Sequence, residues 1–324
     1  MFTARNIRYE LAEKARGLGV GGIGAMHLLA RRTGLIEALD RRLHLLKVHK
    51  TYHESDHVLN IAYNALCNGT CLEDIELRRN DEVYLDALGA QRIPDPTTEG
   101  DFCRRFGGAD VQTLMDTINQ VRVPIWRAQP KTFRERAIID ADGTITPTTG
   151  ECKQGMDISY DGQWGYHPLL ISLANTGEPL FVVNRGGNRP SHEQAAEEVV
   201  FLANDRCNQE NLIAQLKGGV RALVAPLDSL ESNWAYRVMA SLAWTLKAWL
   251  ALLLPETGRW SQQHVSEKQS VLRMEFKRFV NAFLLVPCQI VRQSRRVVYR
   301  LLAWNPWQDV FLRAVEALRY PLRC

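Results

Sequence analysis

The spacing of apolar residues changes near Lys131, and this change restricts the fold more than any other feature of the sequence. Before it, segments such as HLLARRTGLIEALDRRL and SDHVLNIAYNAL repeat apolar residues every three or four positions, which predicts amphipathic helices. After it, short apolar runs end at Asp, Gly, Asn or Pro, which predicts strands joined by turns. We therefore expect a mixed, helix-rich α/β protein.

The first 130 residues are expected to form a helical domain. Ser55 is placed to cap a helix that follows it, and Pro94 and Pro96 interrupt the helical pattern. Thr98 is the expected cap of the next helix, DFCRRFGGADVQTLMDTINQV.

Residues 131–258 are expected to form a second domain. Its strands are predicted in IIDADGT, HPLLISLANTG and EPLFVVNRGG, the last two as a hairpin. A helix is predicted from Ser191, with Gln194 completing a capping box, and a longer one in SNWAYRVMASLAWTLKAWLALLL. The apolar run 238–254 contains Lys247 and is shorter than the ~20 residues of a membrane span, so a buried helix is predicted.

Charge is distributed unevenly over the 324 residues, whose net charge is +4. Residues 259–324 hold ten Arg and two Lys against four acidic residues, a net charge of +8, so the first 258 residues carry −4. Residues 259–324 are expected to form a basic helical segment, with helices around RMEFKRFVNAFLL and VFLRAVEALRY. A basic segment after an acidic body points to a polyanionic partner.

The cysteines and the first residues of the sequence indicate the cellular compartment of the protein. The seven Cys are irregularly spaced, and MFTARNIRYELAEK lacks the apolar run of a signal peptide. We therefore expect a cytoplasmic protein with reduced thiols and no membrane partner.

Two clusters of residues carry possible chemistry. Asp140 and Asp142 end the first predicted strand, where their oxygens suit Mg²⁺ or Mn²⁺, although Asp and Gly are also common in ordinary turns. Arg206, Glu210 and Lys217 are spaced 4 and 7 apart, which places them on one face of a helix. That face suits either a metal ligand between phosphate-binding cations or a solvated surface with a salt bridge.

Together these segments resemble the DDE transposases of bacterial insertion sequences. Arg206-x3-Glu210-x6-Lys217 resembles the signature around their catalytic Glu, and DADGT resembles the segment of their first catalytic Asp. Ala203 replaces the Tyr of that signature. The resemblance implies a ribonuclease H-like core and divalent-metal cleavage and transfer of DNA strands.

The resemblance also implies roles for individual residues. Asp142 is the first carboxylate and Asp140 its neighbouring alternative, whereas Glu210 is the third. Asp142 and Glu210 would be metal ligands for Mg²⁺ or Mn²⁺, and Arg206 and Lys217 would contact DNA. The partners implied are double-stranded DNA, as terminal inverted repeats and target, and a second copy of the chain.

The second catalytic Asp has no counterpart in this sequence. Only 68 residues separate Asp142 from Glu210, and the remaining two strands, one helix and turns occupy them. We infer an internal deletion that removed the middle strands of the core, with the seam near AAEEVVFLANDR. The resulting expectation is a truncated ribonuclease H-like core with impaired catalysis.

The segment VRQSRRVVYR brings together Arg292, Arg295, Arg296 and Arg300. It suits contact with a phosphate backbone, and a solvated basic face is equally compatible. An alternative function is therefore a non-catalytic DNA-binding remnant that occupies element ends or joins intact transposase in mixed oligomers. An open reading frame that folds poorly and has no function is a third interpretation.

Overall fold

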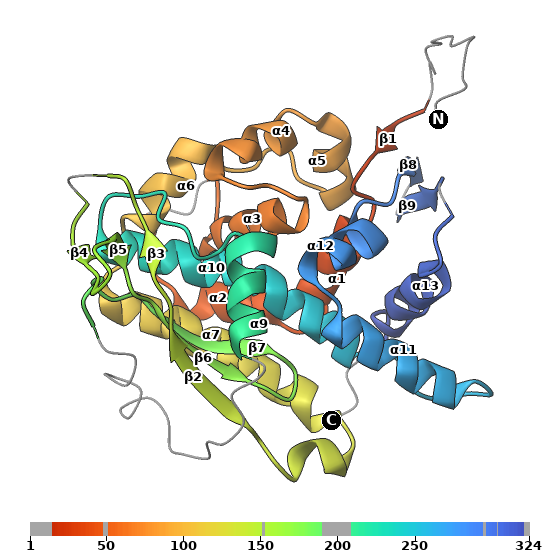
Figure 1. Cartoon of the computed structure of the whole chain (residues 1–324). Coiled ribbons are helices and arrows are strands. Elements are labelled where there is room, and N and C mark those ends of the chain that lie inside the picture. Colours follow the sequence, from red (N-terminus) through yellow and green to blue (C-terminus); the bar gives the residue numbers. More distant parts are fainter. Residues whose placement is uncertain are drawn as a thin grey trace, which may run out of the picture.

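The computed structural model describes residues 15–47, 51–150, 153–189, 209–293, 296–302 and 304–320. Helices account for most of this part of the chain, and Figure 1 shows them on several sides of the long helix α10 (Leu230–Leu252). The helices before α10 are α1 (Ile23–Arg32), α2 (Leu35–Arg42), α3 (Glu54–Leu66), α4 (Ile75–Arg79), α5 (Glu82–Leu88), α6 (Pro96–Cys103), α7 (Gly108–Arg127) and α9 (Gln209–Ala214). Those after it are α11 (Ser261–Arg273), α12 (Phe276–Phe279) and α13 (Gln308–Ala317).

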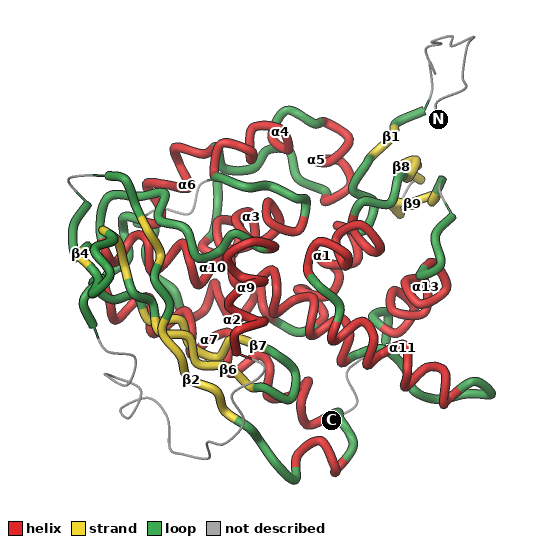
Figure 2. Tube along the Cα trace, in the orientation of Figure 1, coloured by secondary structure: helices red, strands yellow, loops and turns green. Residues whose placement is uncertain are grey.

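The described strands form three small antiparallel sheets, which Figure 2 shows in yellow among the helices. One has the order β2 (Ile139–Gly143), β6 (Leu169–Leu173), β7 (Glu178–Val183). A second joins β3 (Thr146–Pro147), β5 (Trp164–Tyr166) and β4 (Asp157–Ile158). The third joins β1 (Gly17–Leu18), β8 (Cys288–Gln293) and β9 (Arg296–Leu301).

Several predicted elements are confirmed. The three predicted strands are β2, β6 and β7, and β6 and β7 form the predicted hairpin. The predicted long apolar helix is α10, which packs against α3, α7 and β7 and is buried along nearly its whole length. No described helix has the length and apolar character needed to cross a bilayer. The mixed, helix-rich class is therefore correct.

Other predictions were wrong in detail. The helix assigned to a Ser55 cap begins two residues earlier, with His53 at the cap, where the carboxylate of Asp56 accepts a hydrogen bond from the His53 backbone nitrogen at 2.8 Å. Pro96 does not stop a helix but occupies the first position of α6, where the missing N–H of proline costs no helical hydrogen bond. Asp95, rather than Thr98, caps that helix.

The sequence interpretation missed two groups of strands. The β3–β5–β4 sheet consists of strands two or three residues long, which are too short to show an alternating pattern. The β8–β9 hairpin lies in the tail segment expected to be helical, and the predicted helices on either side of it are present as α12 and α13. The capping box predicted at Ser191 and Gln194 lies outside the described residues. The division at residues 130 and 258 stays a prediction.

A buried carboxylate connects the β2–β6–β7 sheet to the helices behind it. Glu178, at the start of β7, is 0% exposed and accepts hydrogen bonds from the indole nitrogens of Trp249 at 2.9 Å and Trp126 at 3.0 Å. The hydroxyl of Thr176 donates a third bond, at 2.7 Å. The guanidinium of Arg122 lies 3.8 Å away and is buried too, so each charge compensates the other inside the core.

We expect Glu178→Ala to destabilise the protein by about 3–5 kcal/mol, because it leaves the Arg122 cation buried without its counter-charge. Glu316→Ala is the matched control, since Glu316 forms an exposed pair with Arg319 that contributes at most about 1 kcal/mol. Urea unfolding of both variants measures the difference. Equal, small losses would contradict the role given to Glu178.

A buried lysine makes stability depend on pH. Lys247 in α10 is 0% exposed, donates to the Leu272 carbonyl at 2.8 Å and lies over the Trp244 ring. Burial lowers the pKa of Lys247 from 10.5 to about 7. Between these two values the unfolded chain binds more protons than the folded one, so this group makes stability rise with pH.

We expect Lys247→Met to remove that contribution, because methionine fills similar space without a titrating group. The difference in unfolding free energy between the original chain and the variant should change by up to about 1.4 kcal/mol per pH unit across this range. Chemical unfolding at pH 6, 7.5 and 9 measures it. A difference that does not vary with pH would contradict the assignment.

Candidate functional site

The two predicted aspartates lie on one face of β2. Asp140 and Asp142 are alternate residues of this strand, so their side chains leave it on the same side, and both are partly buried. In the register with β6, Asp140 is opposite Ser172 and Asp142 is opposite Leu170. In the described part of the chain no strand pairs with the other edge of β2.

Helix α9 brings the segment of the predicted third carboxylate against this strand. Glu210 is exposed in the first turn of α9, and α9 packs on β2. This packing does not bring Asp140, Asp142 and Glu210 together as a set of metal ligands. Among the described residues, no three metal-ligating side chains form such a group. Arg206 lies outside those residues.

The helix changes character after α9, which affects Lys217. Residues Gln215–Gly219 form a π-helical turn, whose hydrogen bonds span five residues instead of four. The prediction that Glu210 and Lys217 share a face assumed a regular α-helix, so it no longer follows from their spacing. Lys217 is exposed, but partial desolvation by its surroundings lowers the pKa of its amine.

Two residues that the sequence interpretation did not select complete the surroundings of Asp142. His167 precedes β6 and Arg185 follows β7; the two form a backbone bond from His167 N to Arg185 O at 2.9 Å. The Arg185 side chain is 5% exposed and its Nε donates to the His167 carbonyl at 3.1 Å. A Cβ on Gly143 would lie 2.5 Å from the His167 ring, so a larger residue beside Asp142 would have to displace that ring.

The charges around His167 show which groups lie near it. Burial lowers the pKa of His167, as do the cations of Arg185 and Lys217, whereas the carboxylate of Asp142 raises it. The imidazole is therefore mainly neutral at pH 7. Asp142, Arg185 and Lys217 all act electrostatically on His167, and these four residues are here called the β2-end cluster. In the sequence, His167 stands in the dipeptide HP before β6 and Arg185 in the dipeptide NR after β7. Neither dipeptide forms a motif that identifies a functional residue.

The β8–β9 hairpin separates the arginines of the tail. Arg296 and Arg300 are two residues of one face of β9, and Arg292 on β8 lies on the opposite face, because it is paired with Val297. Arg292 forms an ion pair with Asp86 at 2.7 Å. Both β9 arginines are exposed, and Arg300 donates to Gln289 at 3.1 Å. Arg295 lies outside the described residues.

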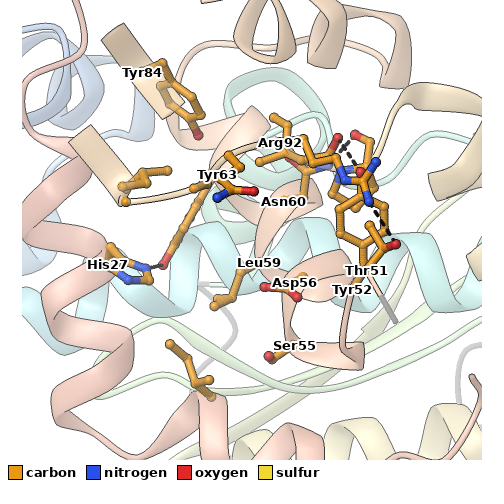
Figure 3. A pocket seen from close by; sticks show the side chains of 17 residues that line it. His27, Thr51, Tyr52, Ser55, Asp56, Leu59, Asn60, Tyr63, Tyr84 and Arg92 are labelled. Atoms are coloured by element: carbon orange, nitrogen blue, oxygen red, sulfur yellow. Dashed lines mark hydrogen bonds between the residues drawn. The ribbon is translucent and has the colours of Figure 1, made fainter. Parts of the chain in front are cut away.

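A separate cavity of about 450 Å³ lies among the N-terminal helices (Figure 3). In it, His27 Nδ1 lies 3.3 Å from the Tyr63 hydroxyl, and Arg92 donates to the Thr51 hydroxyl at 3.0 Å. Burial lowers the pKa of His27. No member of the β2-end cluster lines this cavity, so the two sites are distinct.

Comparison with protein families identifies a matching family. Residues 19–205 match the model described as "Transposase DDE domain group 1", which is more than half of the chain. No curated protein and no solved structure matches the chain.

We expect Asp142→Asn to lower the pKa of His167 further, because the substitution removes the carboxylate that raises it. Titration of the His167 ring protons by NMR measures the change. Asp309→Asn, on α13, is the control and should leave the pKa unaltered. An unchanged His167 pKa in Asp142→Asn would contradict the proximity of the two side chains.

Proposed function

The chain belongs to the transposase DDE domain group 1 family, and on this basis we propose that the β2-end cluster is what remains of a DNA strand-cleavage and strand-transfer site. Asp142 is the first carboxylate in this proposal, Asp140 its alternative and Glu210 the third. The contact of α9 with β2 supports the proposal, since Glu210 belongs to the first turn of α9 and Asp142 to β2.

The basic members of the cluster suit a DNA phosphate. Arg185 is held by its bonds to His167, so its guanidinium is already oriented when a ligand arrives. Lys217 is exposed on the turn after α9 and adds a second cation. Together they would hold the phosphodiester beside Asp142 by charge-assisted hydrogen bonds.

We further propose that catalysis is impaired because the second Asp and its strand were deleted. Two observations support this. The β2 edge has no partner strand in the described residues, and the family match ends at residue 205, within the seam proposed at 195–206.

The family resemblance implies Mg²⁺ or Mn²⁺, and the described residues do not fit a two-ion site. Asp140 and Asp142 supply adjacent oxygens on one face of β2, but these residues offer no third ligand in reach. A site for two ions needs carboxylates on both sides of the reacting phosphate. We therefore derive no catalytic step through a metal for this chain.

The alternative, a non-catalytic remnant that binds element ends or joins intact transposase, is favoured by the exposed pair Arg296 and Arg300 on one face of β9. Such a face can follow a phosphate backbone without any catalytic group. For both functions, the binding of double-stranded DNA, self-association and a cytoplasmic location stay predictions.

A strand-transfer assay with duplex DNA and Mg²⁺ or Mn²⁺ tests the proposal. We expect the full chain to give no more product than Asp142→Ala or Glu210→Ala, because the set of carboxylates is incomplete. DNA binding by the same three proteins, measured in parallel without metal, is expected to persist.

Two results would change this conclusion. Strand transfer by the full chain that both substitutions abolish would show a complete site and overturn the impairment. Absence of DNA binding by all three proteins would contradict the transposase function and its non-catalytic alternative alike.

A further inference from the structure

Backbone irregularities of two kinds meet at one surface cavity of about 340 Å³. Asn68 and Arg221 are the non-glycine residues with positive φ in the described chain, at 67° and 55°, and both line it. Two π-helical turns also reach it, Gln215–Gly219 through its glycines and Val280–Leu284 through Asn281. Strained backbone and π turns both concentrate at functional sites.

The side chains of this cavity are polar and basic. Arg221 and Lys277 line it and are exposed, and neither forms an ion pair within the described residues. Asn68, Thr70 and Asn281 add polar groups. The carboxylate of Asp74 is held in its own turn, where it accepts hydrogen bonds from Thr70 N at 2.6 Å and Thr70 Oγ1 at 3.0 Å. Two cations without carboxylate partners suit an anion.

The walls of the cavity are fixed to one another. The side-chain oxygen of Gln215 accepts a hydrogen bond from Phe276 N at 2.9 Å, which ties the first π turn to the start of α12 and to Lys277 beside it. A Cβ on Gly219 would lie 3.0 Å from Phe276 Cβ, so this close approach favours glycine. The cavity therefore exists before any ligand binds.

The cavity adjoins the β2-end cluster along the chain. The charge of Lys217 lowers the pKa of His167 in that cluster. The two residues after Lys217, Gly218 and Gly219, line the cavity. The π-helical turn Gln215–Gly219 contacts α12, the helix that leads to Asn281. The turn that carries Lys217 therefore also contributes residues to the cavity.

We propose that this cavity binds a backbone phosphate of the same DNA that contacts the β2-end cluster. The proposal rests on the proposed function for its ligand. Arg221 and Lys277 neutralise the phosphate, and the polar side chains around them hydrogen-bond to its oxygens. The site has no sequence preference, because it reads only the backbone.

The test compares two double variants of the full chain that lose the same charge. Arg221→Asn with Lys277→Gln empties the cavity of cations, and asparagine tolerates the positive φ at position 221. Arg273→Gln with Arg278→Gln is the control, on exposed residues outside the cavity. Duplex DNA binding without metal is measured from 50 to 200 mM salt, with thermal unfolding to confirm folding.

We expect the cavity variant to bind more weakly and its plot of log K against log[salt] to be shallower by about 1 for each phosphate-binding cation removed. The control variant, Arg273→Gln with Arg278→Gln, should change this slope by less than half as much as the cavity variant does. Equal changes in both variants, unchanged affinity of the cavity variant, or no DNA binding by the original chain would overturn the proposal.

Inorganic phosphate separates a free anion from DNA as the occupant. If phosphate raises the melting temperature of the original chain but not of the cavity variant, while both bind DNA equally, DNA is not the occupant and the proposal is overturned. Because no step in the test needs metal or turnover, a failed strand-transfer assay does not decide its outcome.

Discussion

The carboxylate of Glu178 holds the sheet against the two longest helices of the described chain. It accepts bonds from Trp126 on α7 and Trp249 on α10, and it faces the buried guanidinium of Arg122. A buried carboxylate that loses one of its partners is costly. The contacts of Glu178 therefore fix the position of β7 relative to both helices. Because β7 pairs with β6 and β6 with β2, the same contact sets where Asp142 lies.

The surroundings of Asp142 follow from this frame. His167 and Arg185 stand just outside β6 and β7, on chain ends that the hairpin brings together. Lys217 arrives from a different part of the sequence, on the turn after α9. For the proposed strand-transfer site, the described residues bring basic groups near Asp142 but form no group of three metal-ligating side chains.

Much of the fold could be predicted from local pattern. The runs that became β2, β6 and β7 and the apolar stretch of α10 are long enough for periodicity to be read. The strands β3, β4 and β5 are too short for that, and β8 and β9 lie in a basic segment whose charges masked their alternation. Proline at position 96 was misread because proline interrupts a helix interior but suits its first position.

Residue identity was enough to identify the family and to predict the strand that carries Asp140 and Asp142, and the short separation of Asp142 and Glu210 led to the proposal of a deletion. The folded chain was needed to show that His167 and Arg185 lie beside Asp142, and that Arg292 lies on the opposite face from Arg296. It was also needed to bring Asn68, Arg221 and Lys277 to one cavity. Such groupings join residues far apart in the chain, and no local spacing encodes which of them meet.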